Sequence, residues 1–189
     1  MLLTENVQLN RNRNPNWTRQ EVEAEMHGKL GTSKAIWVPR GLEADTTESG
    51  TDGHIDTLAC FVKPGVVVVH GQPDPDHPDH EATREIEAIM RTETDARGRA
   101  LEVIVLEAPK ERHDHGEPLS CSYVNFSFVN GGVVLCEFDD PQDEVVAGVF
   151  RRLFNDREVV SVPAVDIFRG GGGVHCITQQ EPLCAANGG

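Results

Sequence analysis

A seven-residue pattern occurs twice in this chain, and it limits the folds that the chain can adopt. The segments 61–67 (FVKPGVV) and 128–134 (FVNGGVV) both begin with Phe-Val and end with Gly-Val-Val. Each copy is followed by an acidic, proline-containing loop, a segment with helical spacing of apolar residues, and a further apolar run. This order predicts a unit of strand, glycine turn, strand, helix and strand (ββαβ) that is used twice. Such units bury their apolar faces against neighbouring units, so we expect an α/β array of stacked repeats.

The rest of the chain extends this array at both ends. Short runs rich in β-branched residues predict strands, and three segments with helical periodicity separate them. The predicted strands are 35–38, 57–62, 66–70, 101–106, 123–129, 133–138, 158–162 and 174–178, and the predicted helices are 18–30, 80–93 and 140–154. The first of these helices opens with the capping-box pair Thr18 and Glu21. The N-terminal pattern is typical of the end of a third unit, and the glycine-rich segment 170–182 of the start of another.

The charge balance and the cysteine content exclude several classes of protein. Asp and Glu number 31 against 17 Lys and Arg, and the formal net charge of -14 excludes a general nucleic-acid binder. No apolar run approaches the roughly 20 residues that cross a bilayer, and the first residues lack the features of a secretory signal. The five cysteines form no C-x-x-C pair. We therefore expect a cytoplasmic protein with no membrane or nucleic-acid partner.

The strongest candidate for covalent chemistry is Cys176, which follows four consecutive glycines at 170–173. A glycine-rich turn lets the backbone approach a ligand closely, and a thiolate presented there is a plausible nucleophile. A buried structural cysteine beside a flexible turn is the alternative. The neighbouring His175 is disfavoured as the base, because adjacent residues of a strand at 174–178 point to opposite faces.

His54 and Asp56 are separated by one residue in the segment TDGHIDTLACF. At the start of a strand both side chains would project from the same face, where the histidine can move protons and the carboxylate can bind a cation. A satisfied surface pair at a strand end is an equally good interpretation of the spacing.

A metal site is the main competing interpretation. His77 and His80 have i, i+3 spacing, and His113 and His115 lie further along the chain. These histidines lie in loops rich in Pro and Asp, where solvation explains them better, so we expect no metal.

The glycine run at 170–173 lacks the Lys-Ser/Thr of a phosphate-binding loop. The segment 41–53, which leads directly into His54, favours a cationic ligand through its carboxylates. These are Glu43, Asp45, Glu48 and Asp52.

In this order, the motifs IWVPRGL, GTDGHID, SYVNFSFVNGGVV, DPQDE and GGGGVHCITQQEP resemble the agmatine deiminase family, or bacterial-type peptidylarginine deiminases. The resemblance runs from about Leu3 to Pro182. It implies the α/β propeller of the guanidino-group-modifying superfamily (the pentein fold), which is built from five ββαβ blades. Residues 1–189 would then form a single incomplete domain, the C-terminal part of that propeller. The implied reaction is hydrolysis of agmatine to N-carbamoylputrescine and ammonia.

The resemblance also implies a role for each candidate residue. Cys176 matches the family's nucleophile, His54 its general acid/base, and Asp56 a carboxylate that holds guanidinium nitrogens. Asn125 resembles a position that lines the active site, and Asp52 is a further candidate for substrate binding. The expected ligand is a small cationic guanidinium compound, and neither a metal nor an organic cofactor is needed.

One family motif, Trp-x-Arg-Asp-x-Gly-Pro, is absent from this sequence. In the family it supplies a second guanidinium-binding carboxylate from the N-terminal half, whereas here Trp17-Thr18-Arg19 is followed by Gln20. Two hypotheses remain open. The chain is an incomplete guanidine deiminase, completed by an N-terminal half or in a homo-oligomer. Alternatively, it is a truncated non-catalytic relative that acts as an assembly or binding partner.

Overall fold

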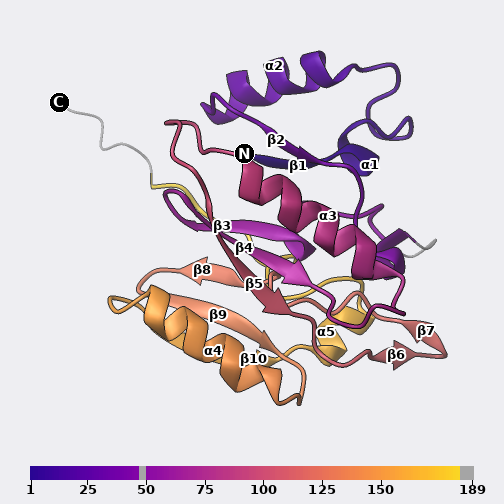
Figure 1. Cartoon of the computed structure of the whole chain (residues 1–189), viewed down its shortest axis with the longest axis vertical. Helices are drawn as coiled ribbons and strands as arrows, with labels where there is room; N and C mark the ends of the chain where they lie inside the picture. Colours follow the sequence, from indigo (N-terminus) through magenta and orange to yellow (C-terminus); the bar gives the residue numbers. More distant parts are fainter. Residues whose placement is uncertain (47–49, 184–189) are drawn as a thin grey trace.

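Two ββαβ units form the centre of the computed structural model, which describes residues 1–46 and 50–183 (Figure 1). In each unit the first two strands are antiparallel, and a helix leads to a third strand parallel to the second. The first unit contains β3 (Ala59–Lys63), β4 (Val66–Gly71), α3 (Asp79–Thr92) and β5 (Glu102–Glu107). The second contains β8 (Ser127–Val129), β9 (Gly132–Glu137), α4 (Gln142–Leu153) and β10 (Glu158–Pro163). The predicted duplication is therefore confirmed.

The N-terminal part forms the end of a third unit, as the sequence predicts. Strands β1 (Leu2–Thr4) and β2 (Ile36–Val38) pair in parallel, and helices α1 (Glu5–Gln8) and α2 (Arg19–Leu30) lie between them in the chain. Thr18 and Glu21 complete a capping box at the start of α2. These two hydrogen bonds satisfy backbone donors that would otherwise lack partners at a helix end.

The tight hairpins of the two units depend on equivalent glycines. Gly65 and Gly131 have φ values of 79° and 77°, a conformation that side chains other than glycine adopt only with strain. The hairpins differ in register, because β3 carries an irregularity between Phe61 and Lys63. The turn glycine is therefore the first residue of the repeated Gly-Val-Val in the first unit and the residue before it in the second.

The core consists of two buried clusters, and the second of them takes residues from both units. In the first, Ile86 and Met90 of α3 belong to the same buried cluster as Val67 and Val69 of β4. The second cluster is more aromatic and includes Tyr123, Phe126, Phe138, Phe150 and Phe168. It extends to Val174 in the turn that precedes Cys176. Packing of the second unit therefore supports one wall of the candidate site.

Three predicted strands differ from the structure. Segment 174–178 is wrong as a strand, because 174–177 form a turn in which the Thr178 amide donates to the His175 carbonyl. Of the predicted strand 123–129, only β8 is extended in a sheet, and Thr57 of the predicted strand 57–62 belongs to a 3-10 helix. In these segments local turn bonds replace strand pairing, as in the bonds from the amides of Thr57 and Asn125 to the carbonyls of His54 and Ser122. No strand follows α5 within the described residues, so 170–182 does not open another unit there.

Several short elements were not predicted from the sequence. They are the 3-10 helices η1 (Glu43–Thr46) and η2 (Ile55–Thr57), strands β6 (His113–Asp114) and β7 (Glu117–Pro118), and helix α5 (Val165–Arg169). Glu48 and Cys184 lie outside the described residues. Among the helices of the described part, none has the length and apolar character to span a membrane.

Replacement of Phe150 by alanine tests the aromatic core of the second unit. The Phe150 ring is fully buried and meets the Phe126 ring edge-on, with centroids 4.7 Å apart. We expect Phe150→Ala to lower the free energy of unfolding by about 3–5 kcal/mol, because it removes buried surface and leaves a cavity. Val145→Ala on the exposed face of the same helix is the control, with an expected change under about 1 kcal/mol. Equal losses in urea unfolding would contradict this packing.

Candidate active site

Three segments that are far apart in the sequence meet at Cys176. Asp56 lies in η2 before β3, Asn125 lies just before β8, and His175 and Cys176 lie in the turn after α5. The sulfur of Cys176 is 3.4 Å from Oδ2 of Asp56 and 3.2 Å from Nδ2 of Asn125. The structure thus brings three of the predicted site residues into one cluster, with the thiol exposed at the surface.

Asn125 connects the parts of this cluster. Its buried side-chain amide donates from Nδ2 to the sulfur of Cys176 and, at 3.4 Å, to the backbone carbonyl of Asp56. Its Oδ1 accepts from the backbone N–H of His175 at 3.0 Å. Only an amide side chain supplies both a donor and an acceptor in this form. Asn125 therefore fixes the turn that carries Cys176 to the segment that carries Asp56.

The glycine run is explained by close packing behind the thiol. A β-carbon on Gly172 would lie 2.7 Å from the sulfur of Cys176. A β-carbon on Gly173 would lie 2.5 Å from Oδ1 of Asn125 and 2.7 Å from the ring of Phe168. These glycines allow the backbone to pass where any side chain would displace the cluster.

His175, which the sequence argument disfavoured as the base, joins the cluster through its contact with Asp56. Its Nδ1 lies 2.7 Å from Oδ2 of Asp56, and the argument from strand alternation fails because the segment is a turn. The hydrogen bond to Asp56, supported by the interaction with Cys176, raises the pKa of His175 to about 10. Burial alone would raise the pKa of Asp56, but the hydrogen bond and charge of His175 outweigh it and the pKa is lowered. The pair is therefore an imidazolium and a carboxylate at neutral pH.

His54 reaches the cluster by a different geometry from the one predicted. It precedes the 3-10 helix η2 and is not at the start of a strand, so the same-face argument for His54 and Asp56 is wrong. The half-buried His54 still lies close enough for its charge to contribute to the lowered pKa of Asp56. Its part in proton transfer stays a prediction.

The carboxylate of Asp52 faces the N-terminal segment. Its Oδ2 accepts from Nδ2 of Asn10 at 3.2 Å and lies 3.7 Å from Nε of Arg13. The role of Asp52 in substrate binding stays a prediction.

By contrast, Oδ1 of Asp56 is buried and has no hydrogen-bond partner among the described residues. An unpaired buried acceptor is costly, so this oxygen is suited to receive an N–H donor.

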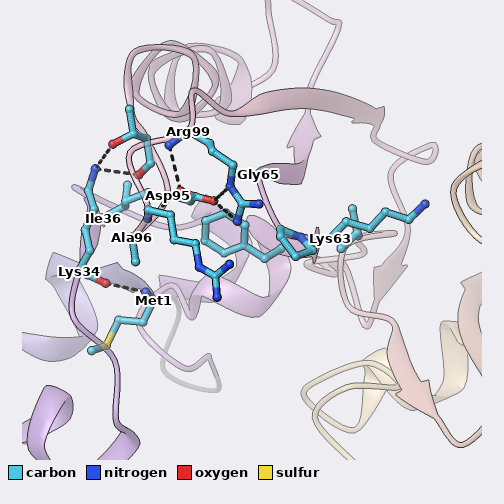
Figure 2. A pocket seen from close by; sticks show the side chains of 13 residues that line it. Met1, Lys34, Ile36, Lys63, Gly65, Asp95, Ala96 and Arg99 are labelled. Atoms are coloured by element: carbon cyan, nitrogen blue, oxygen red, sulfur yellow. Dashed lines mark hydrogen bonds and ion pairs between the residues drawn. The ribbon is translucent and has the colours of Figure 1, made fainter.

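A basic cavity of about 340 Å³ lies at the opposite end of β3 from Asp56 (Figure 2). Lys34 and Arg99 line it, and Figure 2 shows Arg99 bonded to Asp95. Lys34 bonds to Glu93. The positive lining of the cavity disfavours a cationic ligand, which suits the cluster at Cys176 better.

Within the described residues, no group of three or more His, Cys, Asp or Glu side chains is arranged to hold a metal ion.

The stacked ββαβ units, with a cysteine, a carboxylate and an amide gathered near the ends of two of them, define a chain of the pentein fold. A structure of the agmatine deiminase of Enterococcus faecalis catalysing its reaction is 31% identical, with a TM-score of 0.86. The match covers 96% of this chain and 53% of that one. The Porphyromonas-type peptidyl-arginine deiminase family model matches residues 1–182, and the chain belongs to this family of agmatine deiminase-type hydrolases.

Individual relatives agree with this family. A candidate agmatine deiminase of Streptomyces avermitilis is 56% identical over 184 residues, and the agmatine deiminase of Pseudomonas syringae pv. tomato is 36% identical over 200 residues. Each match covers 96% of this chain and 53% of the relative. The chain therefore spans about half the length of the curated relatives it matches.

The ion pair between His175 and Asp56 predicts a pH-dependent stability. Because the folded-state pKa of His175 is raised, its contribution is complete below about pH 6.5, the unfolded value, and is lost as the pH rises through about 10. Because the pKa of Asp56 is lowered, its contribution is present above about pH 4 and is lost as the pH falls. The pair is therefore most stabilising at about pH 5–6.5.

Comparison with His175→Gln measures this contribution. At pH 6 we expect the free energy of unfolding of the wild type to exceed that of the variant by about 1 kcal/mol or less, since the imidazole is half exposed. At pH 10.5 we expect the two free energies of unfolding to be equal. Urea unfolding at both pH values measures the difference, and NMR titration of the His175 ring should give a midpoint near pH 10. A midpoint near 6.5 would contradict the ion pair.

Proposed function

We propose that the protein to which this chain belongs is a guanidine deiminase that hydrolyses agmatine to N-carbamoylputrescine and ammonia. The observation that carries the proposal is the 3.4 Å approach of the Cys176 sulfur to the Asp56 carboxylate. The proposal is supported by a family whose named members include agmatine deiminases. A nucleophile beside a carboxylate is suited to a substrate whose electrophilic carbon lies within a cation.

A guanidinium group fits this arrangement for electrostatic and geometric reasons. It is planar and cationic, and its N–H groups form parallel hydrogen bonds to a carboxylate. Asp56 remains ionised because its pKa is lowered, and its Oδ1 has no partner among the described residues. Its Oδ2 already accepts from a cation, the imidazolium of His175. The net charge of -14 also favours the approach of a cationic substrate.

The reaction then proceeds in two stages. The thiolate of Cys176 attacks the guanidinium carbon and forms a carbon–sulfur bond, while Asp56 holds the substrate nitrogens. His54 protonates the departing nitrogen, the carbon–nitrogen bond breaks and ammonia leaves. His54 next takes a proton from water, which attacks the same carbon and displaces the thiolate to release the ureido product. Asn125 donates to the sulfur and so stabilises its anionic form, and the sequence of steps needs neither a metal nor an organic cofactor.

We further propose that residues 1–189 form an incomplete domain, the C-terminal part of a five-bladed propeller. The chain covers 53% of its relatives, and the family motif with a second guanidinium-binding carboxylate is absent from the sequence. An N-terminal half, or a second copy of the chain, would complete the site. The same absence favours the second candidate function, a non-catalytic assembly partner.

Replacement of Cys176 by alanine tests the proposed chemistry. Ammonia and ureido product are measured with agmatine, using the chain alone and the chain with the N-terminal half of a full-length relative. We expect Cys176→Ala to lower turnover at least about a thousand-fold, because the nucleophile is lost. Cys60→Ala is the control, and we expect it to retain turnover because burial raises the pKa of Cys60 to about 11 and keeps that thiol protonated.

The outcomes separate the two candidate functions. Equal turnover in the wild type and in Cys176→Ala would rule out Cys176 as the nucleophile. No turnover in any mixture, combined with stable binding of the N-terminal half in size-exclusion chromatography, would favour the assembly partner.

A further inference from the structure

The described residues between Gly41 and His54, which are 41–46 and 50–54, are organised around the buried carboxylate of Asp45. Oδ2 of Asp45 accepts hydrogen bonds from the backbone N–H groups of Gly53 and His54 at 3.0 and 3.1 Å and from the Thr51 hydroxyl at 2.6 Å. Oδ1 accepts from the Thr51 backbone N–H at 3.0 Å. The side chain is thus an internal acceptor for the segment and is turned away from solvent, with only 5% of Asp45 exposed. A carboxylate that accepts several N–H groups fixes their positions strongly.

Glycines allow this segment to close on itself. A β-carbon on Gly41 would lie 2.1 Å from the α-carbon of Gly53, and Gly53 has a φ of 93°. A β-carbon on Gly50 would lie 2.1 Å from the carbonyl oxygen of Asp45. Among the described residues the backbone therefore packs directly against itself near the carboxylate, where an added side chain would not fit.

Two further contacts hold the segment to the rest of the fold. Oδ1 of Asp79, in the first turn of α3, accepts from the Glu43 backbone N–H at 2.7 Å. The guanidinium of Arg13 donates to the carbonyl of Thr51 at 2.9 Å. The backbone of Gly53 and His54 is consequently tied, through Asp45, to a helix of the first unit and to the N-terminal segment.

We propose that Asp45 is a positioning residue that holds the backbone of His54 so that its imidazole stays near Asp56. The inference rests on the proposed function, in which His54 moves protons during both stages. A proton-transfer group acts only within hydrogen-bond reach of its partner, so a fixed backbone at His54 raises the rate of the chemical step. Asp45 itself does not touch the reacting atoms in this account.

Asp45→Asn is the sharpest test, because it keeps the shape of the side chain. Both oxygens of Asp45 accept from donors, so the amide NH₂ of asparagine would face a donor in either orientation. We expect amide hydrogen exchange at Gly53 and His54 to become at least about ten-fold faster. In the mixture with the N-terminal half of a full-length relative, we expect kcat for agmatine to fall about 10- to 100-fold while KM stays within about two-fold, because the effect is on the positioned base.

Glu43→Gln is the matched control, since it removes one carboxylate charge from an exposed position in the same 3-10 turn. It should leave exchange at Gly53 and His54, and turnover, at the wild-type values. Thr51→Val, which removes one hydrogen bond to Asp45 while keeping the side-chain shape, should give an intermediate effect and serves if Asp45→Asn does not fold.

The two measurements distinguish the inference from the proposed function. Wild-type exchange at Gly53 and His54 in Asp45→Asn or Thr51→Val would overturn the positioning role. Faster exchange with unchanged kcat would also overturn it. A third outcome is faster exchange in Asp45→Asn with no agmatine turnover in either the wild type or the variant. This outcome would support the role of Asp45 in the loop and would count against the proposed function alone.

Discussion

The site depends on one side-chain amide, that of Asn125. Its Nδ2 contacts the sulfur of Cys176 and the backbone carbonyl of Asp56, and its Oδ1 accepts from the backbone of His175. These bonds add to the direct contacts that His175 and Cys176 make with the carboxylate of Asp56, which lies 120 residues before Cys176. The buried position of Asn125 gives these bonds their value, because water does not compete for them.

The duplication explains how two of the three site segments reach the same place. Asp56 lies three residues before β3 and Asn125 two residues before β8, and these are the first strands of the two units. Stacked repeats bring the same ends of their first strands together, and both residues lie just before those ends. The third segment, with Cys176, is held by the aromatic core of the second unit through Phe168 and Val174.

The sequence predicts the units well because their signals are local. Gly65 and Gly131 mark tight turns, and the periodicity of α3 and α4 follows from apolar spacing within each helix. The segment at 174–177 could not be predicted in this way. Its few apolar residues fit a strand, but Asn125, about 50 residues earlier, supplies the hydrogen bonds that make it a turn. The argument that His175 and Cys176 point to opposite faces of a strand depended on that error.

The segment before His54 shows a second limit of local patterns. Its acidic residues suggest a surface that attracts cations, yet the carboxylate of Asp45 is buried and bonded to the backbone, and that of Asp52 faces Arg13. A usable signal was present in the glycines at 41, 50 and 53, whose spacing is typical of a tight, closed loop and not of a strand entry. Charge in a sequence shows neither where a carboxylate points nor what it binds.

The central claim is that the carboxylate of Asp56 holds a flat cation against the sulfur of Cys176. Alkylation by chloroacetamidine, a cationic reagent, and by chloroacetamide, its neutral counterpart, measures this directly by mass spectrometry of the Cys176 peptide. The account predicts that Asp56→Asn slows the reaction with chloroacetamidine about ten-fold or more and leaves that with chloroacetamide nearly unchanged. Equal reactivity of wild type and Asp56→Asn toward the cationic reagent would contradict it.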